Sequence, residues 1–333
     1  MSIDTLSDVL RTVRLRGVAF LYVSCGTEWA AHAPAAREIA AAVMPGVEHV
    51  MEYHVMTKGA GWASIAGQPP VRLAAGDIVM FPQGDEHVMS SAPGLEPARS
   101  DPREYEAMRD HPKPVPISYH GIDSFSIDTP SPGALTNLVC GFFGCDVRPF
   151  NPLIATLPRL LHLPAAGDAW AVAALQQAVN ASQTGRPGSA AVLERLSEMM
   201  FVEAIRRYVD ALPPEGTGWL AGLRDRHVGR ALALLHAEPA RDWTMEALAE
   251  AAAISRSALY ERFVHFVGQP PMQYLTQWRM QVAARLLHEG HAPVASVALE
   301  VGYESEAAFS RAFKRQTGKP PATWRRESRP ARR

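Results

Sequence analysis

Two histidines and one glutamate have residue types and a spacing that suit metal binding. Glu52 and His54 lie two residues apart in a β-type run, so both side chains share one face of a strand. His87 ends the motif GDIVMFPQGDEH, in which a turn, a buried strand and a second turn direct the histidine inward. We predict no bound metal and no cofactor. His54 and His87 are retained as candidate effector contacts or metal ligands, against the alternative that they are ordinary inward-facing or rim residues.

Three cysteines, Cys25, Cys140 and Cys145, offer thiol chemistry. They are too few for a disulfide framework and too unevenly spaced for a zinc site of the CxxC type. Cysteine in a cytosolic protein is more often a small buried apolar residue than a reactive group. The alternative is redox sensing, in which an oxidant attacks Cys25 and a second cysteine resolves the product. Cys25 and Cys140 are therefore candidate sensor residues.

Polar side chains recur on the outer faces of two helices near the C-terminus. In the first, residues 256–267, apolar residues spaced by four face the core and leave polar residues on the outer, N-terminal part. In a helix-turn-helix that part enters the major groove, where arginine binds guanine and serine, tyrosine or glutamate meets other base edges. A second helix follows Ser305 in the same way, with a lysine further along for phosphate. The predicted DNA contacts are Arg256, Ser257, Tyr260, Glu261, Glu306, Ala307, Ser310, Arg311 and Lys314.

A duplicated unit positions these two helices. When the sequence is aligned with itself at an offset of 50 residues, Phe263 aligns with Phe313 and Gly268 with Gly318. Each copy has a short alanine-rich helix, a tight connection, and a second helix that begins at a serine and ends at a glycine. A long helix over residues 272–288 is expected to fix the separation of the two copies, because successive major grooves on one face of DNA lie about 34 Å apart. The alternative, a plain helical bundle with solvated charges, does not explain the duplication.

Short β-type runs separated by turn residues fill the first half of the chain and predict a sandwich or barrel. Residues 137–143 are expected to close the barrel, and the proline- and charge-rich residues 92–116 to form a long exposed loop. Residues 191–212 predict a helix with a wide apolar stripe. The stripe either packs on the barrel or forms a dimer contact. The earlier strands are predicted over residues 18–25, 48–57, 62–66, 71–73, 78–81 and 87–90.

Charge is divided unevenly along the chain, although the net charge is only -1. Residues 220–333 contain 17 Lys and Arg against 11 Asp and Glu, a net of +6, which leaves 16 against 23, a net of -7, for the rest. Only the C-terminal part is therefore expected to meet a polyanion. No apolar run approaches the ~20 residues of a membrane span, and the polar N-terminus lacks a signal-peptide core. We predict a cytoplasmic protein without a membrane partner.

Residues 248–324 resemble the DNA-binding domain of the AraC/XylS family. The matching motifs are S-x-x-x-L-x-x-x-F from Ser255, Y-L-x-x-x-R from Tyr274 and F-S-R-A-F-K-R from Phe309. G-x-x-P follows each of the two predicted DNA-contacting helices, which we call the reading helices. The resemblance implies activation or repression of transcription, with double-stranded promoter DNA and RNA polymerase as partners. The motif that ends at His87 resembles the second motif of the cupin fold, and the N-terminal region is similar to the cupin-type sensors of some of these regulators. A metal-dependent cupin enzyme has three histidines and a carboxylate around its ion, so the resemblance makes Glu52, His54 and His87 an incomplete ligand set.

The first helix departs from the family pattern. The family usually has a basic residue two positions before Phe263 and another just after it, whereas this chain has Glu261 and Val264. The departure implies that the first helix binds phosphate less strongly, or that Glu261 accepts a hydrogen bond from cytosine.

These patterns together predict an α+β protein, with an N-terminal cupin-like β-barrel followed by an all-α domain with two helix-turn-helix units. The expected divisions are a sensor domain over 1–160, a helical connector and candidate dimerisation region over 161–213, a linker over 214–219 and the DNA-binding domain over 220–333. We expect a sequence-specific transcriptional regulator, not an enzyme, whose barrel senses a small molecule or an oxidant and modulates promoter binding, with homodimer formation an open question. The alternative is a metal-dependent cupin enzyme fused to a DNA-binding domain.

Overall fold

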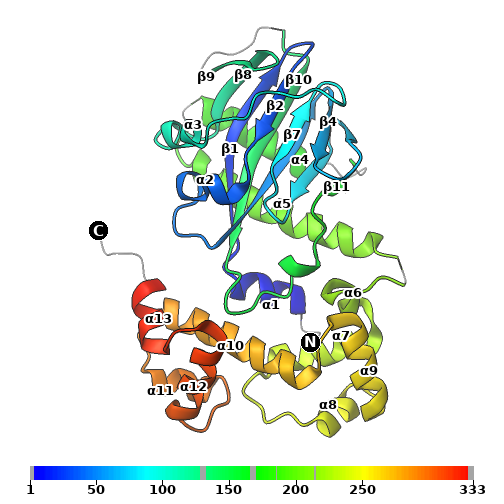
Figure 1. Cartoon of the computed structure of the whole chain (residues 1–333), viewed down its shortest axis with the longest axis vertical. Coiled ribbons are helices and arrows are strands. Elements are labelled where there is room, and N and C mark those ends of the chain that lie inside the picture. Colours follow the sequence, from blue (N-terminus) through cyan, green and yellow to red (C-terminus); the bar gives the residue numbers. More distant parts are fainter. Residues whose placement is uncertain (1–3, 128–132, 166–169, 185, 214, 329–333) are drawn as a thin grey trace. The chain divides into compact units, whose positions relative to one another are not determined.

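The chain divides into two compact units in a computed structural model that describes residues 4–127, 133–165, 170–184, 186–213 and 215–328 (Figure 1). The barrel unit comprises residues 15–145 and 157–208. The helical unit comprises residues 1–14, 146–156 and 209–333. Among the described helices, none has the length and apolar character needed to span a membrane.

Two β-sheets enclose the apolar core of the barrel unit. The strands are β1 (Arg16–Cys25), β2 (Ala30–Ala33), β3 (His49–Lys58), β4 (Ala60–Ile65), β5 (Val71–Ala74), β6 (Ile78–Phe81), β7 (His87–Ser90), β8 (Val115–Gly121), β9 (Ser124–Ile127), β10 (Thr136–Cys145) and β11 (Leu161–Leu163). One sheet has the order β11-β6-β3-β10-β1-β8-β9, and the other has the order β2-β7-β4-β5. Both sheets contribute to one core, for example Phe20 and Met56 from the larger sheet and Ile65 and Met89 from the smaller. The predicted barrel is therefore a pair of facing sheets.

Strand β10 is central in the larger sheet and does not close a barrel edge, contrary to the sequence-based expectation. It pairs with β1 on one side and β3 on the other. Gly141 is needed at this crowded position, because a Cβ there would lie 2.1 Å from the Val18 carbonyl oxygen and 2.6 Å from the Tyr53 ring. The apolar run that suggested a closing strand reflects burial of both faces of β10.

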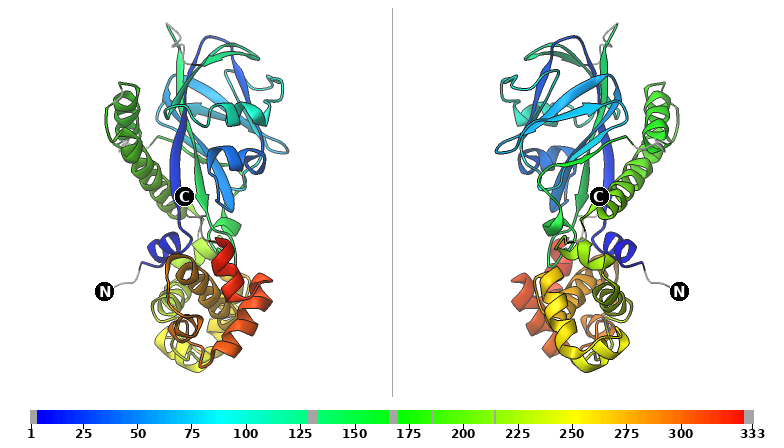
Figure 2. Two further views of the ribbon diagram at one scale, coloured as in Figure 1. Left: turned by 90° about the vertical axis from the view of Figure 1, so that its left-hand side faces the viewer. Right: turned by 90° about the vertical axis from the view of Figure 1, so that its right-hand side faces the viewer.

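Helices α4 (Trp170–Gln183) and α5 (Ser189–Ala211) cover the outer face of the larger sheet (Figure 2). The Ser197 hydroxyl of α5 lies 2.9 Å from the Tyr53 hydroxyl of β3. The rings of Phe201 and Phe143 approach to 4.9 Å between centroids. The buried side of the α5 stripe thus packs within the chain, where burial of each large apolar side chain stabilises the fold by about 1.5–3 kcal/mol.

The region predicted as a long exposed loop contains ordered structure. Helix α3 (Pro102–Ala107) begins after Asp101, whose carboxylate accepts a hydrogen bond from the Arg103 backbone N–H. Tyr105 and Met108 are buried in the barrel core, so two apolar side chains anchor an otherwise polar segment. Strand β8 begins inside the same predicted loop, at Val115. Helix α2 (Ala36–Val43) was likewise absent from the sequence-based strand pattern.

The helical unit contains the duplicated motif and two segments from earlier in the chain. Helix α1 (Thr5–Thr12) contains Asp8, whose carboxylate lies 3.0 Å from His236 Nδ1. Arg14 forms two hydrogen bonds of 2.6 and 2.7 Å to Asp146. These contacts place α1 and residues 146–156 with the helical unit, so its boundaries differ from the divisions expected from sequence. Its helices are α1 (Thr5–Thr12), α6 (Trp219–Arg224), α7 (Arg226–Ala237), α8 (Met245–Ala251), α9 (Arg256–Val267), α10 (Pro271–Glu289), α11 (Val294–Glu300), α12 (Glu306–Thr317) and α13 (Pro321–Ser328).

Candidate DNA interface and effector site

Helices α9 and α12 are built in the same way, as the duplication predicts. Ser255 caps α9 by accepting from the Ala258 backbone N–H at 3.4 Å, and Ser305 caps α12 by accepting from Ala308 at 3.2 Å. Each helix ends at a glycine in the left-handed conformation, with φ 78° at Gly268 and 77° at Gly318. Serine satisfies an unpaired N–H at the start, and glycine adopts positive φ at the end without a Cβ clash. Both helices therefore have defined ends.

The predicted DNA contacts lie on the outer faces of these two helices. Phe263 of α9 and Phe309 and Phe313 of α12 are fully buried and fix the inner faces. On α9, Tyr260 is 46% exposed. Only Ser310 of the predicted set is half-buried. The exposed members are Arg256, Ser257, Tyr260, Glu261, Glu306, Ala307, Arg311 and Lys314.

Two arginines of α9 already have acidic partners within the helical unit. Arg256 pairs with Glu246 of α8 at 2.8 Å, and both side chains are well exposed. Arg262 forms hydrogen bonds of 2.8 and 2.5 Å to Asp225. Asp225 also caps α7 by accepting from the His227 and Val228 backbone N–H groups. Arg262 thus holds α9 against α7, which leaves this helix with less positive charge for DNA than its sequence indicated.

Helix α12 presents its basic residues more freely. Arg311, Lys314 and Arg315 are all exposed, and the described residues offer them no ion-pair partner within 4 Å. Guanidinium and ammonium groups of this kind bind guanine edges or phosphate oxygens. The two reading helices are therefore structurally alike and electrostatically different.

Helix α10 joins the two helix-turn-helix units as one rigid connector. Tyr274, Trp278 and Met280 are fully buried. The Tyr274 hydroxyl accepts from the Trp219 indole N–H at 2.8 Å and lies 2.8 Å from His236 Nε2. Met280 belongs to the core of the second unit, together with Phe309. One helix thus contributes to both cores, which fixes the separation of the reading helices.

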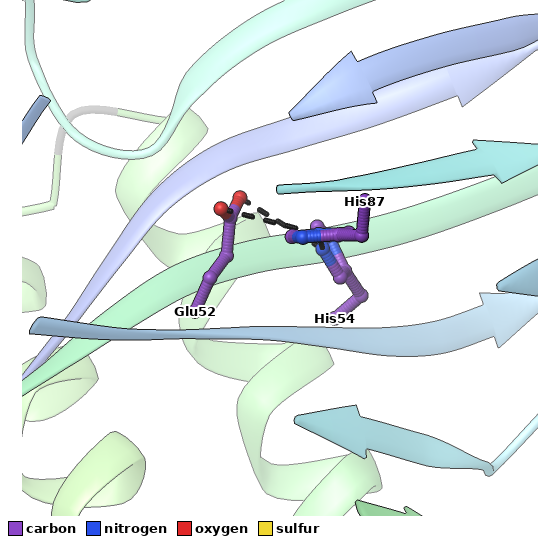
Figure 3. Close-up of side chains that lie close together, drawn as sticks. All are labelled: Glu52, His54 and His87. Carbon is purple, nitrogen blue, oxygen red and sulfur yellow. Dashed lines mark hydrogen bonds and ion pairs between the residues drawn. The ribbon is translucent and has the colours of Figure 1, made fainter. Parts of the chain in front are cut away.

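Glu52, His54 and His87 come together in the interior of the barrel unit (Figure 3). Glu52 and His54 project from one face of β3, while Tyr53 on the opposite face contacts α5. The Nε2 atoms of His54 and His87 lie 2.7 Å apart. Glu52 carboxylate oxygens lie 3.8 Å from His54 Nε2 and 4.0 Å from His87 Nε2. All three residues are buried, with 2%, 4% and 2% of their surface exposed, so neither histidine lies at the rim.

Burial determines the protonation of this cluster. It raises the pKa of Glu52 to about 8. Burial lowers the pKa of His87 to about 4 and, with the neighbouring His87, holds the pKa of His54 well below its usual range. At neutral pH the carboxyl is therefore largely protonated and the imidazoles are neutral, so the short contacts between Glu52 and the histidines are not ion pairs.

A small cavity of about 40 Å³ adjoins the cluster. It is large enough to hold a water molecule, which needs ~10–15 Å³. Apolar and aromatic side chains make up most of its wall, and Glu52, His54 and His32 supply polar groups. The sequence did not identify the aromatic part of this wall, because nothing in the local pattern brings Trp29, Tyr105 and Tyr119 to one place. The other lining residues are Leu21, Val23, Ala31, Ala33, Met89, Leu138 and Cys140.

The cysteines lie in the interior of the barrel unit. Cys25, Cys140 and Cys145 are all buried. Burial raises the pKa of the Cys25 thiol. Burial, and then the nearby Glu52 and Cys25, raise the pKa of Cys140 well above its usual value. The nucleophilic form of cysteine is the thiolate, so this environment disfavours reaction with an oxidant.

Comparison with known proteins identifies both halves of the chain. Residues 4–210 match the cupin family, and residues 248–327 match a helix-turn-helix domain family. A putative AraC-like transcription regulator of Streptomyces lividans is 33% identical over 97% of this chain and 98% of its own length. The regulator AlkR of Acinetobacter baylyi is 28% identical over 98% of this chain and 100% of its own length.

Among solved structures, the DNA-binding domain of AdpA in complex with a target DNA is 30% identical and covers 31% of this chain and 93% of its own length, with a TM-score of 0.30. The full-length relatives are transcription regulators rather than enzymes. The chain therefore belongs to the AraC-like, DNA-binding transcription regulators, with a cupin domain followed by a helix-turn-helix region.

Proposed function

We propose that this regulator reads promoter DNA through the outer faces of α9 and α12. The observation that carries the proposal is the pair of serine-capped, glycine-terminated helices, held by one connector and exposing base-reading side chain types. Arg311 and Lys314 of α12 supply the main anchoring charge. Arg256, Ser257, Tyr260 and Glu261 of α9 supply discrimination, and Glu306, Ala307 and Ser310 complete the second surface. A protein with this activity acts in the cytoplasm, where it meets promoter DNA and RNA polymerase.

The barrel unit is proposed to hold the effector site, with the cavity beside Glu52 and His54 as its location. Its mostly apolar and aromatic wall with a few polar groups resembles the lining of a small-molecule site, and its volume of about 40 Å³ suits a molecule of only a few atoms. A small molecule is favoured over an oxidant, because burial raises the pKa of the Cys25 and Cys140 thiols.

Fluorescence anisotropy of the full chain on its promoter fragment tests the DNA proposal. Arg311→Ala is expected to weaken binding by about 1–3 kcal/mol at a base contact, and Lys314→Ala to weaken all sequences alike and lower the salt slope by about one. Arg72→Ala removes an exposed arginine of the barrel unit and serves as the matched control. Equal affinity of Arg311→Ala and Arg72→Ala, or affinity that does not fall with salt, would contradict the proposal.

A further inference from the structure

We propose that Asp8 of α1 and Gln281 of α10 are positioning residues for DNA reading, through which α1 and residues 146–156 set the position of the connector helix α10. Both segments lie outside residues 248–327, which match the helix-turn-helix family. Both belong to the helical unit, where α1 lies beside α7 and α10 (Figure 1). This role rests on the proposed function, because it concerns how the two reading helices are held at the spacing that promoter DNA requires.

A chain of buried hydrogen bonds runs from α6 through α10 and α7 to α1. The Trp219 indole N–H donates to the Tyr274 hydroxyl at 2.8 Å, and that hydroxyl lies 2.8 Å from His236 Nε2. His236 Nδ1 lies 3.0 Å from the Asp8 carboxylate. Because a carboxylate only accepts, Nδ1 carries the hydrogen, and Nε2 accepts from the Tyr274 hydroxyl. One arrangement of hydrogens thus satisfies every member, and Asp8 sets its direction.

Burial makes this chain of hydrogen bonds depend on α1. Trp219, Tyr274 and His236 are all buried, and the His236 ring lies 3.9 Å from the Trp278 ring between centroids. A buried imidazole N–H that loses its acceptor is strongly unfavourable. Without Asp8, the histidine must turn or change its tautomer. Either change breaks the hydrogen bond from Tyr274, which belongs to the connector helix.

Residues 146–156 contact the same helix at two further points. The Phe150 backbone N–H donates to the Gln281 side-chain oxygen at 2.9 Å, and Gln281 is buried. The Phe150 ring packs edge-on against Tyr274, with 5.3 Å between centroids. Phe263 of the reading helix α9 meets the same tyrosine at 5.7 Å. Tyr274 therefore contacts both a segment from the first half of the chain and the core of a reading helix.

The position of α10 matters because this helix contributes to the cores of both helix-turn-helix units. Two linked binding modules gain affinity through effective concentration only if the geometry lets both engage at once. A displaced connector should therefore weaken binding to DNA that engages both reading helices. It should leave binding through one helix unchanged, which separates positioning from a general loss of fold.

Fluorescence anisotropy of the full chain on two duplexes tests this role. One duplex is the intact promoter fragment, and in the other the segment protected by one reading helix in footprinting is randomised. Asp8→Ala and Gln281→Met should each weaken binding to the intact duplex about tenfold, a part of the ~100-fold or more that joint engagement supplies, and leave binding to the randomised duplex unchanged. Asp8→Asn keeps an oxygen acceptor and should retain wild-type affinity. Glu215→Ala, which removes an exposed carboxylate of the same unit, is the matched control.

Hydrogen exchange of residues 271–289, measured without DNA, gives a second readout. Exchange reports local opening of a helix, and it should rise in Asp8→Ala and stay at the wild-type rate in Glu215→Ala. Unchanged exchange in Asp8→Ala would overturn the positioning role, and so would equal losses of affinity on both duplexes. Raised exchange together with a wild-type chain that does not bind the promoter would instead count against the proposed function alone.

Discussion

At the scale of single residues, Glu261 is the position where this chain departs most clearly from a basic DNA-binding helix. It is exposed on α9, and Arg262 beside it is directed to Asp225. The helix therefore presents a carboxylate where phosphate contact would favour a cation. A glutamate accepts from the cytosine amino group, which makes Glu261 a candidate for discrimination rather than affinity.

Glu261→Ala is expected to narrow the difference in binding free energy between specific and non-specific DNA. Loss of the negative charge should raise the affinity for random DNA, while loss of the carboxylate acceptor should cost about 1–3 kcal/mol on the specific site. Anisotropy titrations on the promoter and on a scrambled duplex, at equal salt, measure both. An unchanged ratio of the two affinities would remove Glu261 from the reading surface.

The buried thiols give a second residue-scale prediction. Since burial raises the pKa of Cys25 and Cys140, thiol reagents should label the native chain slowly and all three cysteines only after denaturation. Rapid labelling of the native protein that disappears in Cys25→Ala would instead favour redox sensing, and induction by oxidants would then be compared between wild type and that variant.

At the scale of elements, Asp225 joins two helices of the helical unit. It caps α7 and accepts two hydrogen bonds from Arg262 of α9. Burial alone would raise the pKa of its carboxyl, but the hydrogen bonds from Arg262 and from the Val228 and His227 backbone N–H groups outweigh burial and lower it. The ionised carboxylate is therefore the form that stabilises the fold.

Asp225→Ala is expected to lower the free energy of unfolding by about 1–2 kcal/mol at neutral pH, because an N-cap is lost. A carboxyl whose pKa is depressed on folding contributes fully above its unfolded value, near pH ~4, and the contribution is lost as pH falls through the lower folded value. The difference in free energy of unfolding between wild type and Asp225→Ala should therefore disappear at low pH. Urea denaturation followed by circular dichroism measures it, with Glu246→Ala as a control that removes only an exposed pair worth about 0–1 kcal/mol. A difference in free energy of unfolding that stays constant with pH would show that the ionised Asp225 carboxylate is not the stabilising form.

At the scale of the whole molecule, the barrel unit and the helical unit are joined by more than one stretch of chain. The chain passes between them at residues 14–15, 145–146, 156–157 and 208–209. Strands β1 and β10, which pair within the barrel unit, both continue directly into segments of the helical unit. The backbone therefore connects β1 directly to α1 and β10 directly to residues 146–156.

Homodimer formation is predicted to use the outer side of α5. Val192 and Met199 are 51% and 49% exposed on this helix. Val192 also lines a groove together with Ala174, Gln177 and Leu196. Two protomers would bring four reading helices to one promoter and raise affinity through effective concentration. Light scattering should find a dimer for wild type and for Arg72→Glu, and a monomer for Met199→Glu. A Met199→Glu variant that remains dimeric would exclude this surface.

The sequence by itself determined the helical half of this protein and its place among the AraC-like, DNA-binding transcription regulators. Helix caps, the offset of 50 residues and the core phenylalanines act over a few residues, so local pattern was sufficient to predict α9, α12 and their exposed faces. The local alternation of a β-strand likewise predicted that Glu52 and His54 share one face. The sequence did not predict that α1 and residues 146–156 belong to the helical unit, because they join it through long-range contacts such as that of Asp8 with His236.

Tertiary structure alone decided the chemistry of the barrel unit. His87 meets His54 only because β7 and β3 belong to facing sheets, and Tyr105 reaches the core from a segment that reads as loop. Burial, which depends on the whole fold, sets the protonation of Glu52 and of the thiols. Likewise the sequence predicts Arg256 as a DNA contact and places a second positive charge, Arg262, on the same helix. Only the packing of α7 and α8 beside α9 shows that each arginine already has a carboxylate partner.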